Sequence, residues 1–227
     1  KGLGKNKPLM WILAASLIFM VNTMLIGTVN VYLFKDYFAN TTALSIWGLM
    51  QTIAVFLVIP FVKTLVSKYG KKEVASAGVA LAAVVYFLLF FLKDLSAMPF
   101  VFISFIGMVG FGFFNLVIWA FVTDVIDYHE FLTGLREDAT VYSIYSMARK
   151  IGQAVAGGLG GVLIGVVGYN SALDMQTQET LNGIHALGTL LPAVIFLIIF
   201  LMIVFFYPLN KKRTLQLAAD LAEKRVN

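Results

Sequence analysis

The chain has 227 residues, of which 60% are hydrophobic and only 13% charged, and its mean hydropathy is +0.88. Soluble domains carry roughly a quarter of charged residues, so this composition excludes an ordinary soluble domain and indicates a membrane protein. The sequence has no cysteine, which excludes disulfides and thiolate chemistry, and its two histidines show no metal-ligand spacing, so we expect neither a metal nor a cofactor.

The chain starts with the basic and polar stretch KGLGKNKP. The apolar run that follows is too long for the h-region of a signal peptide, so we expect no signal peptide. The first residue is Lys1 rather than methionine. This start suggests that the sequence is a segment of something longer, or a processed or trimmed polypeptide.

Six apolar runs predict an all-α membrane protein. Each run has about 19 residues or more, enough for a helix to cross a hydrocarbon core of about 30 Å. A barrel is excluded because its strands would alternate apolar and polar residues, and these runs do not. The runs are roughly Leu9–Phe34, Ala43–Val66, Val74–Leu92, Ala97–Val122, Ala139–Val167 and Ala186–Tyr207. We therefore expect a six-helix transmembrane bundle over residues 1–208 and a cytoplasmic tail over 209–227.

The Lys and Arg residues predict which connections face the cytoplasm. Fifteen of the 17, beginning with Lys1, lie before the first run, at or near the second and fourth connections, or after the sixth run, whereas Lys35 and Lys93 lie elsewhere. The positive-inside rule then assigns both ends to the cytoplasm of a multi-pass cell-membrane protein. The same rule accounts for the net charge of +5. We therefore expect a lipid bilayer, and no nucleic acid, as partner.

The stretch TDVIDYHEFLTGLRED, residues 123–138, gathers five of the 12 acidic residues. Asp124, Asp127 and Glu130 would share one face of a continuing helix just beyond the membrane boundary. Repulsion among three carboxylates is tolerable only in water or opposite cations. The nearest cations in sequence are Arg136, Arg149 and Lys150. A solvated helix end and a cytoplasmic ionic latch that breaks when the helices rock both stay open.

The fifth run carries a polar stripe. At about 100° per residue, its polar and small residues fall within an arc of roughly 100°. They are Tyr142, Ser146, Arg149, Lys150, Gln153, Gly157 and Gly160. Such a face fits a helix that lines an aqueous cavity, with Lys150 about 17 Å from a helix start near residue 139. Alternatively the span begins at Ile151 and both cations only flank it, although about 17 residues would then be at the short end of the allowed range.

Other residues in the runs allow two interpretations each. Gly157, Gly161 and Gly165 form a GxxxG ladder, which is typical of close helix packing. In the fourth run Asn115 and Trp119 lie one turn apart, where they could bind and stack on a sugar ring, or serve as an interhelical hydrogen bond and an interfacial anchor.

No carboxylate lies well inside any run, so these residues are poorly equipped for an ion site. His129 and His185 lie at the edges of runs, where we expect solvated side chains. The tail from Asn210 to Asn227 is expected to be a solvated amphipathic helix.

Two stretches resemble the glycoside–pentoside–hexuronide:cation symporters, the melibiose-permease-like family of the major facilitator superfamily. They are FVTDVIDYHEFLTGLRE at 121–137 and YSIYSMARKIGQAVAGGLGG at 142–161, followed by Gly168–Tyr169. In that family A-D-x-x-D-Y-x-E-x-x-x-G-x-R precedes an eleventh helix that carries a lysine. Here Thr123 replaces the usual Ala, and His129 stands where Gly is common. The resemblance covers essentially the whole chain but only the C-terminal half of such a transporter.

The resemblance implies a C-terminal six-helix bundle of two three-helix repeats, with a sugar cavity between it and an N-terminal half. It implies that Lys150 is a cavity lysine linked to coupling, and that Ser146 and Asn115 face the sugar. Together with the polar positions of the fourth and fifth runs, the candidate substrate-binding and coupling residues are Lys150, Ser146, Asn115, Trp119, Tyr142, Gln153 and Arg149. The implied cytoplasmic charge network consists of Asp124, Asp127, Glu130 and Arg136.

The function implied by the resemblance is symport of a small-molecule sugar with a cation by alternating access. The N-terminal six-helix half is the implied partner, and it would hold most of the site for the coupling Na⁺ or H⁺. Lipid carriers share the loop motif, so a lysolipid-type carrier is an alternative. A stand-alone six-helix scaffold is another, although it has no reason to carry the stripe around Lys150. We do not expect an enzyme, because no H-E-x-x-H motif is present and neither histidine lies deep.

Overall fold

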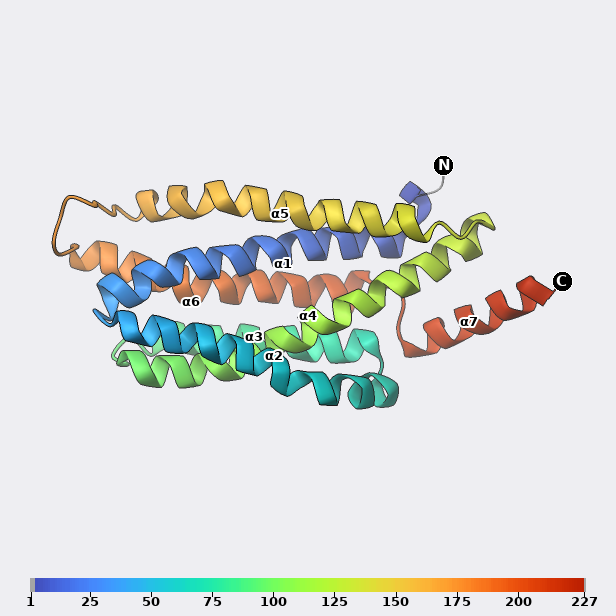
Figure 1. Ribbon diagram of the computed structural model, residues 1–227, viewed down its shortest axis with the longest axis horizontal. Coiled ribbons are helices and arrows are strands. Elements are labelled where there is room, and N and C mark those ends of the chain that lie inside the picture. Colours follow the sequence, from blue (N-terminus) through green and yellow to red (C-terminus); the bar gives the residue numbers. More distant parts are fainter. Residues whose placement is uncertain (1–2, 227) are drawn as a thin grey trace.

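The apolar runs of the sequence all lie in helices of the computed structural model, which describes residues 3–226. Lys1, counted above among the basic residues, lies outside this part. The elements are the 3₁₀ turn η1 (Leu3–Lys5), α1 (Lys7–Tyr32), the π-helical turn η2 (Leu33–Tyr37), α2 (Thr41–Tyr69), α3 (Lys71–Phe91), α4 (Ala97–Thr133), α5 (Asp138–Val166), α6 (Gln178–Leu201), the π-helical turn η3 (Met202–Phe206) and α7 (Lys211–Val226). Figure 1 shows the long helices α1 to α6 lying along one common direction beside one another, with α7 projecting from one end.

Local chemistry explains where several helices begin and end. The side chains of Asn6, Asn40 and Thr177 accept hydrogen bonds from the first turns of α1, α2 and α6, which satisfies backbone donors that a helix leaves unpaired. Gly134 ends α4 in the left-handed region, at φ 73°, a conformation that costs glycine little.

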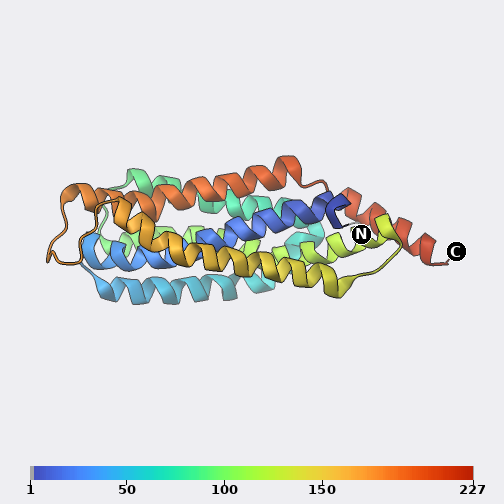
Figure 2. The ribbon, with the colours of Figure 1, turned by 90° about the horizontal axis from the view of Figure 1, so that it is seen from above.

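The helices pack in an order that places α1 and α4 inside the bundle. α1 packs mainly on α5 and α6, α3 on α4 and α6, and α2 on α4. Figure 2 shows α5 and α2 on one side of α1 and α4, with α6 and α3 on the other. The crossing of α3 and α4 is close because Gly78 meets Gly110, where an added Cβ would come within 2.6 Å of a carbonyl oxygen. The two inner helices therefore separate an α5/α2 side from an α6/α3 side.

Both ends of the described chain lie at one end of the bundle, which we call the terminal end (Figure 1). The α2–α3 turn and the α4–α5 connection lie there as well. These are the connections in which the basic residues gather. The assignment of the terminal end to the cytoplasm stays a prediction from those charges.

Within residues 3–226, five helices are long and apolar enough to cross a membrane: α1 with η2, α2, α3, α4, and α6 with η3. α5 has 29 residues and is long enough, but it does not reach the same apolarity. Its polar stripe, which includes Arg149, Lys150 and Gln153, is the reason. The sixth span therefore stays a prediction.

The acidic stretch is helical. The fourth apolar run ends near Val122, but α4 continues to Thr133. Asp124, Asp127 and Glu130 therefore stand on the same continuous helix as Asn115 and Trp119. The end of the apolar run and the end of the helix differ because helix termination depends on Gly134 rather than on polarity.

α7 is packed rather than wholly solvated, so the expectation of a solvated tail was wrong for one of its faces. Leu217 and Leu221 are buried, and the Lys224 ammonium lies 4.1 Å from the centre of the Phe131 ring at the end of α4. At the start of α7, the Lys211 ammonium donates to the Ser67 and Lys68 carbonyl oxygens at the end of α2. α7 thus links two helices of the bundle. The periodicity of the tail predicts an apolar face, but not the surface that covers it.

Candidate functional site

The α1 and α2 helices line an open hollow of about 580 Å³ on the α5/α2 side of the bundle. Its lining combines hydroxyls, an amide and aromatic rings: Thr23, Met24, Gly27, Thr28, Val31 and Tyr32 from α1, and Trp47 and Gln51 from α2. A concave surface of this composition can bind a small polar molecule, because the rings supply apolar contact and the few polar groups fix its orientation. In the sequence, Thr28, Tyr32 and Gln51 are visible as polar residues that interrupt the first two apolar runs. Nothing else in those runs indicates that the lining residues would share a hollow.

Two further asparagines of α1 are buried inside the bundle. Asn22 and Asn30 are at most 1% exposed, and neither the oxygen nor the nitrogen of either amide has a partner among the described residues. An unpaired buried polar group costs about 1–3 kcal/mol. α1 therefore carries more polarity than its role as an inner helix requires.

Where α4 meets α5, an aromatic and cationic cluster brings together three of the predicted site residues, Trp119, Tyr142 and Arg149. The Arg149 guanidinium lies 5.1 Å from the centre of the Trp119 ring and donates to the Tyr145 hydroxyl at 3.2 Å. The Trp119 ring contacts both Tyr142, at 6.0 Å between centroids, and Tyr145, at 5.2 Å. Trp119 and Tyr142 remain about half exposed, so the cluster presents two accessible aromatic rings, tilted by 31° to each other, beside a cation.

Tyr145 was absent from the predicted set. It is fully buried and supports both the Trp119 ring and Arg149 from behind. Its place three residues after Tyr142 and four before Arg149 is a helical spacing that could have indicated this contact.

The other predicted residues of the polar stripe lie nearby without forming one cluster. Lys150 is exposed, and no ion pair or hydrogen bond of its ammonium is found among residues 3–226. Gln153 donates to the Met20 sulfur of α1 at 3.7 Å. Ser146 and Asn115 are half-buried, with no side-chain hydrogen bond to another residue of the described part. The structure therefore joins Trp119, Tyr142 and Arg149, and leaves Lys150, Ser146 and Asn115 available to a ligand or another chain.

The contacts between α5 and α1 use other glycines than the predicted GxxxG ladder. A Cβ added at Gly152 would lie 2.7 Å from the Leu17 carbonyl oxygen, and one at Gly160 would lie 2.9 Å from the Thr28 side chain, so these positions make the close approach to α1. Cβ atoms at Gly157, Gly161 and Gly165 would meet nothing within 4 Å. The predicted ladder is therefore open within this chain, and the packed stripe lies on a neighbouring face.

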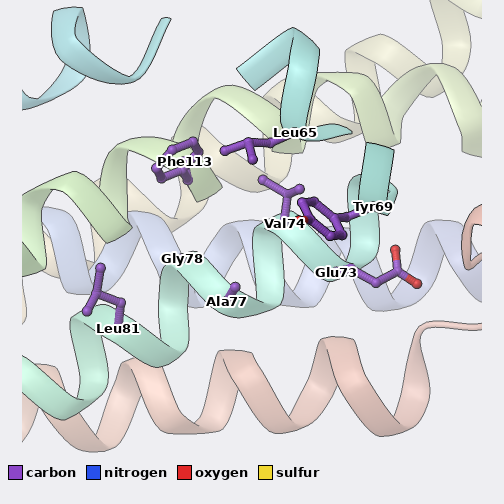
Figure 3. Close-up of a pocket in the computed structure, with 8 residues that line it drawn as sticks. All are labelled: Leu65, Tyr69, Glu73, Val74, Ala77, Gly78, Leu81 and Phe113. Carbon is purple, nitrogen blue, oxygen red and sulfur yellow. The ribbon is translucent and has the colours of Figure 1, made fainter. Parts of the chain in front are cut away.

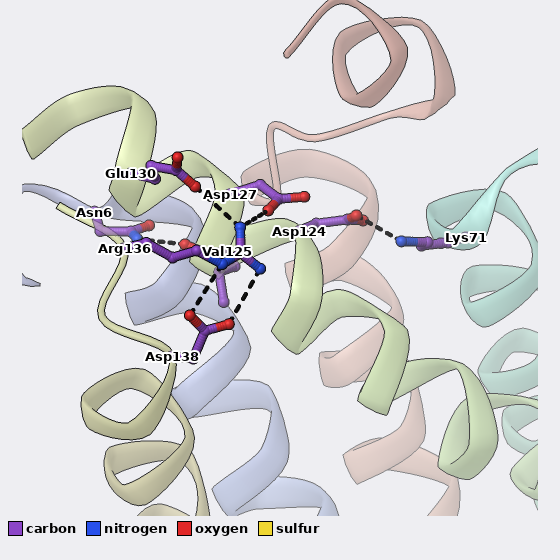
Figure 4. Close-up of polar contacts among 8 residues, drawn as sticks. All are labelled: Asn6, Lys71, Asp124, Val125, Asp127, Glu130, Arg136 and Asp138. Atoms are coloured by element: carbon purple, nitrogen blue, oxygen red, sulfur yellow. Dashed lines mark hydrogen bonds and ion pairs between the residues drawn. The ribbon is translucent and has the colours of Figure 1, made fainter. Parts of the chain in front are cut away.

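At the terminal end, Arg136 holds three carboxylates (Figure 4). Its guanidinium donates to Asp127 and to Glu130 at 2.9 Å each and pairs with Asp138 at 3.0 Å. The hydrogen bonds that Arg136 donates to Asp127 and Glu130 raise the pKa of Arg136 above its ordinary value, so its side chain stays charged. Beside this cluster, the Asn6 amide donates to the Val125 carbonyl oxygen at 2.9 Å and ties the start of α1 to α4 (Figure 4).

Asp124 belongs to a separate ion pair. It is 3% exposed and pairs with Lys71 from the start of α3, whose ammonium also donates to the Ala120 carbonyl oxygen at 3.1 Å (Figure 4). Of the three cations expected opposite the carboxylates, only Arg136 takes that place, since Arg149 points to the aromatic cluster and Lys150 is exposed. Lys71 was missed because it lies 53 residues before Asp124, and nothing local connects them.

Both histidines are buried, so the expectation of solvated side chains was wrong. His129 is fully buried and its Nε2 lies 2.8 Å from a Glu137 carboxylate oxygen. His185 is 2% exposed and stacks on Tyr37 at 4.9 Å between ring centroids. His129 is buried because α4 continues past the end of its apolar run. His185 lies inside the bundle because α6 already starts at Gln178, before its apolar run begins.

A bundle of helices that are mostly long and apolar enough to cross a membrane defines a class of protein, the multi-pass membrane proteins. Comparison with protein-family models makes the assignment specific. The model described as MFS/sugar transport protein matches residues 1–211. The chain therefore belongs to this family of major-facilitator membrane proteins, which confirms the resemblance drawn from the two motifs.

Relatives of this family are carriers and symporters. The chain is 31% identical over 222 residues to an uncharacterized symporter of Bacillus subtilis, covering 96% of this chain and 47% of the relative. It is 28% identical over 225 residues to a glucuronide carrier protein homolog of Escherichia coli, covering 98% and 49%. It is 31% identical over 222 residues to a candidate sulfoquinovose importer of the same organism, covering 97% and 47%. The chain spans about half the length of the curated relatives it matches.

Proposed function

We propose that these residues form the C-terminal six-helix half of a secondary transporter that moves an acidic sugar together with a cation. In this proposal α5 is the sixth span and the terminal end faces the cytoplasm of a bacterial cell. An N-terminal half of similar size would cover the α5/α2 side. The chain's match to about half of each relative's length supports this division.

The observation that carries the proposal is the unpartnered polar side of the bundle. The hollow beside Thr23 and Gln51, the Arg149 cluster and the Lys150 ammonium all stand on α1, α2, α4 and α5, whose polar side chains here have few partners. A lipid-facing surface would not combine amides and cations with aromatic rings in this way, because intramembrane charges are expensive. A sugar cavity between two halves would use all of them.

The cations suggest the substrate class. Arg149 and Lys150 have no carboxylate partner among residues 3–226. Glucuronides and sulfoquinovose, named for two of the relatives, both carry an acidic group on a sugar ring. We assign Trp119 and Tyr142 to stacking on the ring, Arg149 to pairing with the acidic group, and Lys150 to coupling. Ser146, Asn115 and Gln153 would supply hydrogen bonds to hydroxyls.

The Arg136 cluster and the Lys71–Asp124 pair give the proposed cytoplasmic latch a physical basis. They tie α4 to α3 and to the connection that leads into α5. Rocking of these helices would break the pairs, so they would favour one state of the transporter until substrate and cation bind. The coupling Na⁺ or H⁺ is assigned mainly to the N-terminal half.

Two measurements test the proposal in sequence. The intact mass of the native polypeptide, captured from membranes with an antibody to α7, should be near twice the 25.0 kDa of this chain. Uptake of a radiolabelled glucuronide by cells carrying that polypeptide should then fall at least ten-fold on Lys150→Gln. A matched control is Lys212→Gln, an exposed lysine of α7, which should leave uptake unchanged.

Competition assigns the substrate. Excess glucuronate should block uptake more strongly than excess glucose if Arg149 binds the acidic group, and Arg149→Gln should remove this difference. Block by a lysophospholipid, and by neither sugar, would assign the protein to the lysolipid-type carriers. A native mass near 25 kDa with no sugar uptake would overturn the transporter proposal in favour of a stand-alone six-helix scaffold.

A further inference from the structure

An apolar groove outside the proposed sugar site lies at the terminal end of the bundle, between the last turns of α2 and the first half of α3 (Figure 3). It has a volume of about 430 Å³. Its walls are Leu65 and Tyr69 of α2, Val74, Ala77, Gly78 and Leu81 of α3, and Phe113 of α4, with Glu73 as the remaining lining residue. Apart from Glu73 and the hydroxyl of Tyr69, these side chains offer a ligand no polar group.

The position of the groove within the membrane indicates an occupant with a hydrocarbon chain. α2 and α3 are both long and apolar enough to cross a membrane, and the groove runs along them from the turn at Gly70 toward Leu81. It therefore lies in the leaflet at the terminal end, where a phospholipid acyl chain is the apolar molecule at hand. Ala77 is the small side chain of its lining, and a larger residue at this position would fill the groove.

The mouth of the groove carries one charge of each sign. The Glu73 carboxylate is exposed and has no hydrogen bond or ion pair with the described residues. The Lys68 ammonium lies 5.1 Å from the centre of the Tyr69 ring, which forms part of the wall, and has no carboxylate partner within residues 3–226. Of the neighbouring lysines, Lys71 pairs with Asp124. The Lys72 ammonium donates to the Tyr207 carbonyl oxygen and lies close enough to interact with the charge of Glu73, but it makes no ion pair with it.

We propose that this groove binds a phosphatidylethanolamine molecule, with an acyl chain along Ala77 and Leu81, the phosphate at Lys68 and the primary ammonium at Glu73. The complementarity is specific. A primary ammonium donates hydrogen bonds to a carboxylate, which the quaternary ammonium of phosphatidylcholine cannot do, and phosphatidylglycerol has no cation to offer Glu73. A purely anionic lipid would meet repulsion from Glu73.

A second apolar groove of the same bundle provides an internal comparison. It has about the same volume, 420 Å³, and lies between α3 and α6, where Ala83, Val84, Phe87, Leu88, Phe91, Ala193 and Leu197 line it. No charged residue lines it. It can accept a hydrocarbon chain but has no means to select a headgroup, so it should bind phospholipids without preference.

Native mass spectrometry of the full-length polypeptide that contains these residues tests the proposal. Phosphatidylethanolamine, phosphatidylcholine and phosphatidylglycerol with identical acyl chains would each be added to protein in mild detergent. The wild type should retain phosphatidylethanolamine at least five-fold more than either other lipid. Glu73→Gln should remove the preference over phosphatidylcholine, Lys68→Gln should weaken binding of all three lipids in this groove, and Ala77→Trp should fill the groove and abolish the preference for phosphatidylethanolamine.

The matched control is Val84→Trp, which places the same bulk on the same helix in the second groove and should leave the preference intact. Thermal unfolding of each variant shows whether it is folded. Equal retention of the three lipids by the wild type, no adduct at all, or an unchanged preference in folded Ala77→Trp would each overturn the proposal. Loss of the preference in Val84→Trp as well would also overturn it, because the effect would not be local to the groove.

Discussion

Lys71 and Arg136 neutralise the carboxylates of α4 in physically different settings. Arg136 and its three carboxylates are mostly half-exposed, and ion pairs of that kind contribute about 0–1 kcal/mol each. Asp124 is buried, and only about a quarter of the Lys71 side chain is exposed. Breaking a buried pair leaves an uncompensated charge, which costs about 3–5 kcal/mol. The Lys71–Asp124 pair therefore contributes more to stability, and the Arg136 cluster is the easier of the two to open.

Removal of Lys71 should destabilise the protein more than removal of its partner. Lys71→Met leaves a buried carboxylate without a cation and should cost about 3 kcal/mol, whereas Asp124→Asn leaves a lysine that can turn toward water and should cost about half as much. The double variant should recover most of the loss, because both charges are then absent. Denaturation of the full-length protein in detergent measures this, with Lys212→Gln as the control. Additive losses in the double variant would show that the two residues are not coupled.

Among the six long helices, α5 is one of the two with the fewest buried residues, the other being α2, and it is fixed mainly on α1 through one narrow stripe. That stripe contains Tyr145, Gly152, Ala156 and Gly160, while apolar residues on the far side, such as Val162, are exposed. A helix held on one side only can move relative to the bundle or receive a partner on the other side. This seating suits the proposed role of α5 beside a sugar cavity.

The two glycine faces of α5 should respond differently to alanine. Gly152→Ala puts a methyl group 2.7 Å from the Leu17 carbonyl oxygen, and overpacking of this kind costs about 1–3 kcal/mol. Gly157→Ala meets open space and should be neutral or stabilising by up to about 1 kcal/mol, because alanine favours a helix. Thermal unfolding compares the pair. If Gly157→Ala keeps stability but lowers transport, the open face contacts the other half; equal destabilisation by both would contradict the seating of α5.

α7 should detach from α4 when its buried face is made polar. Leu217→Asp combined with Leu221→Asp places carboxylates in the apolar contact at the end of α4, whereas Leu215→Asp changes a residue that is 64% exposed and serves as the control. Detachment exposes the segment between Tyr207 and Lys211. Limited proteolysis there should be at least ten-fold faster in the double variant than in the control. Equal cleavage rates would show that Leu217 and Leu221 do not hold the helix.

The sequence predicted the helical class, the positions of the long helices and the family, because each of these depends on local apolar runs or on motifs. It did not predict the contacts that join distant segments. Lys71 with Asp124, Lys211 with the end of α2, and the burial of His185 all require the packing of whole helices. The glycine ladder shows the same limit, since periodicity identified small residues on α5 but not which of two adjacent faces meets α1.

The bundle as a whole should associate or aggregate more readily when it is expressed alone than when it is part of a longer polypeptide. It leaves the hollow beside Gln51, the Trp119 ring and the glycine face of α5 open on one side. In a transporter of two halves that side would be covered, so expression of these 227 residues alone should give dimers or aggregates in mild detergent. Size-exclusion chromatography with light scattering measures this, with the full-length polypeptide as control. A monodisperse and stable monomer of this chain would count against the missing half, because the open polar side would then need no partner.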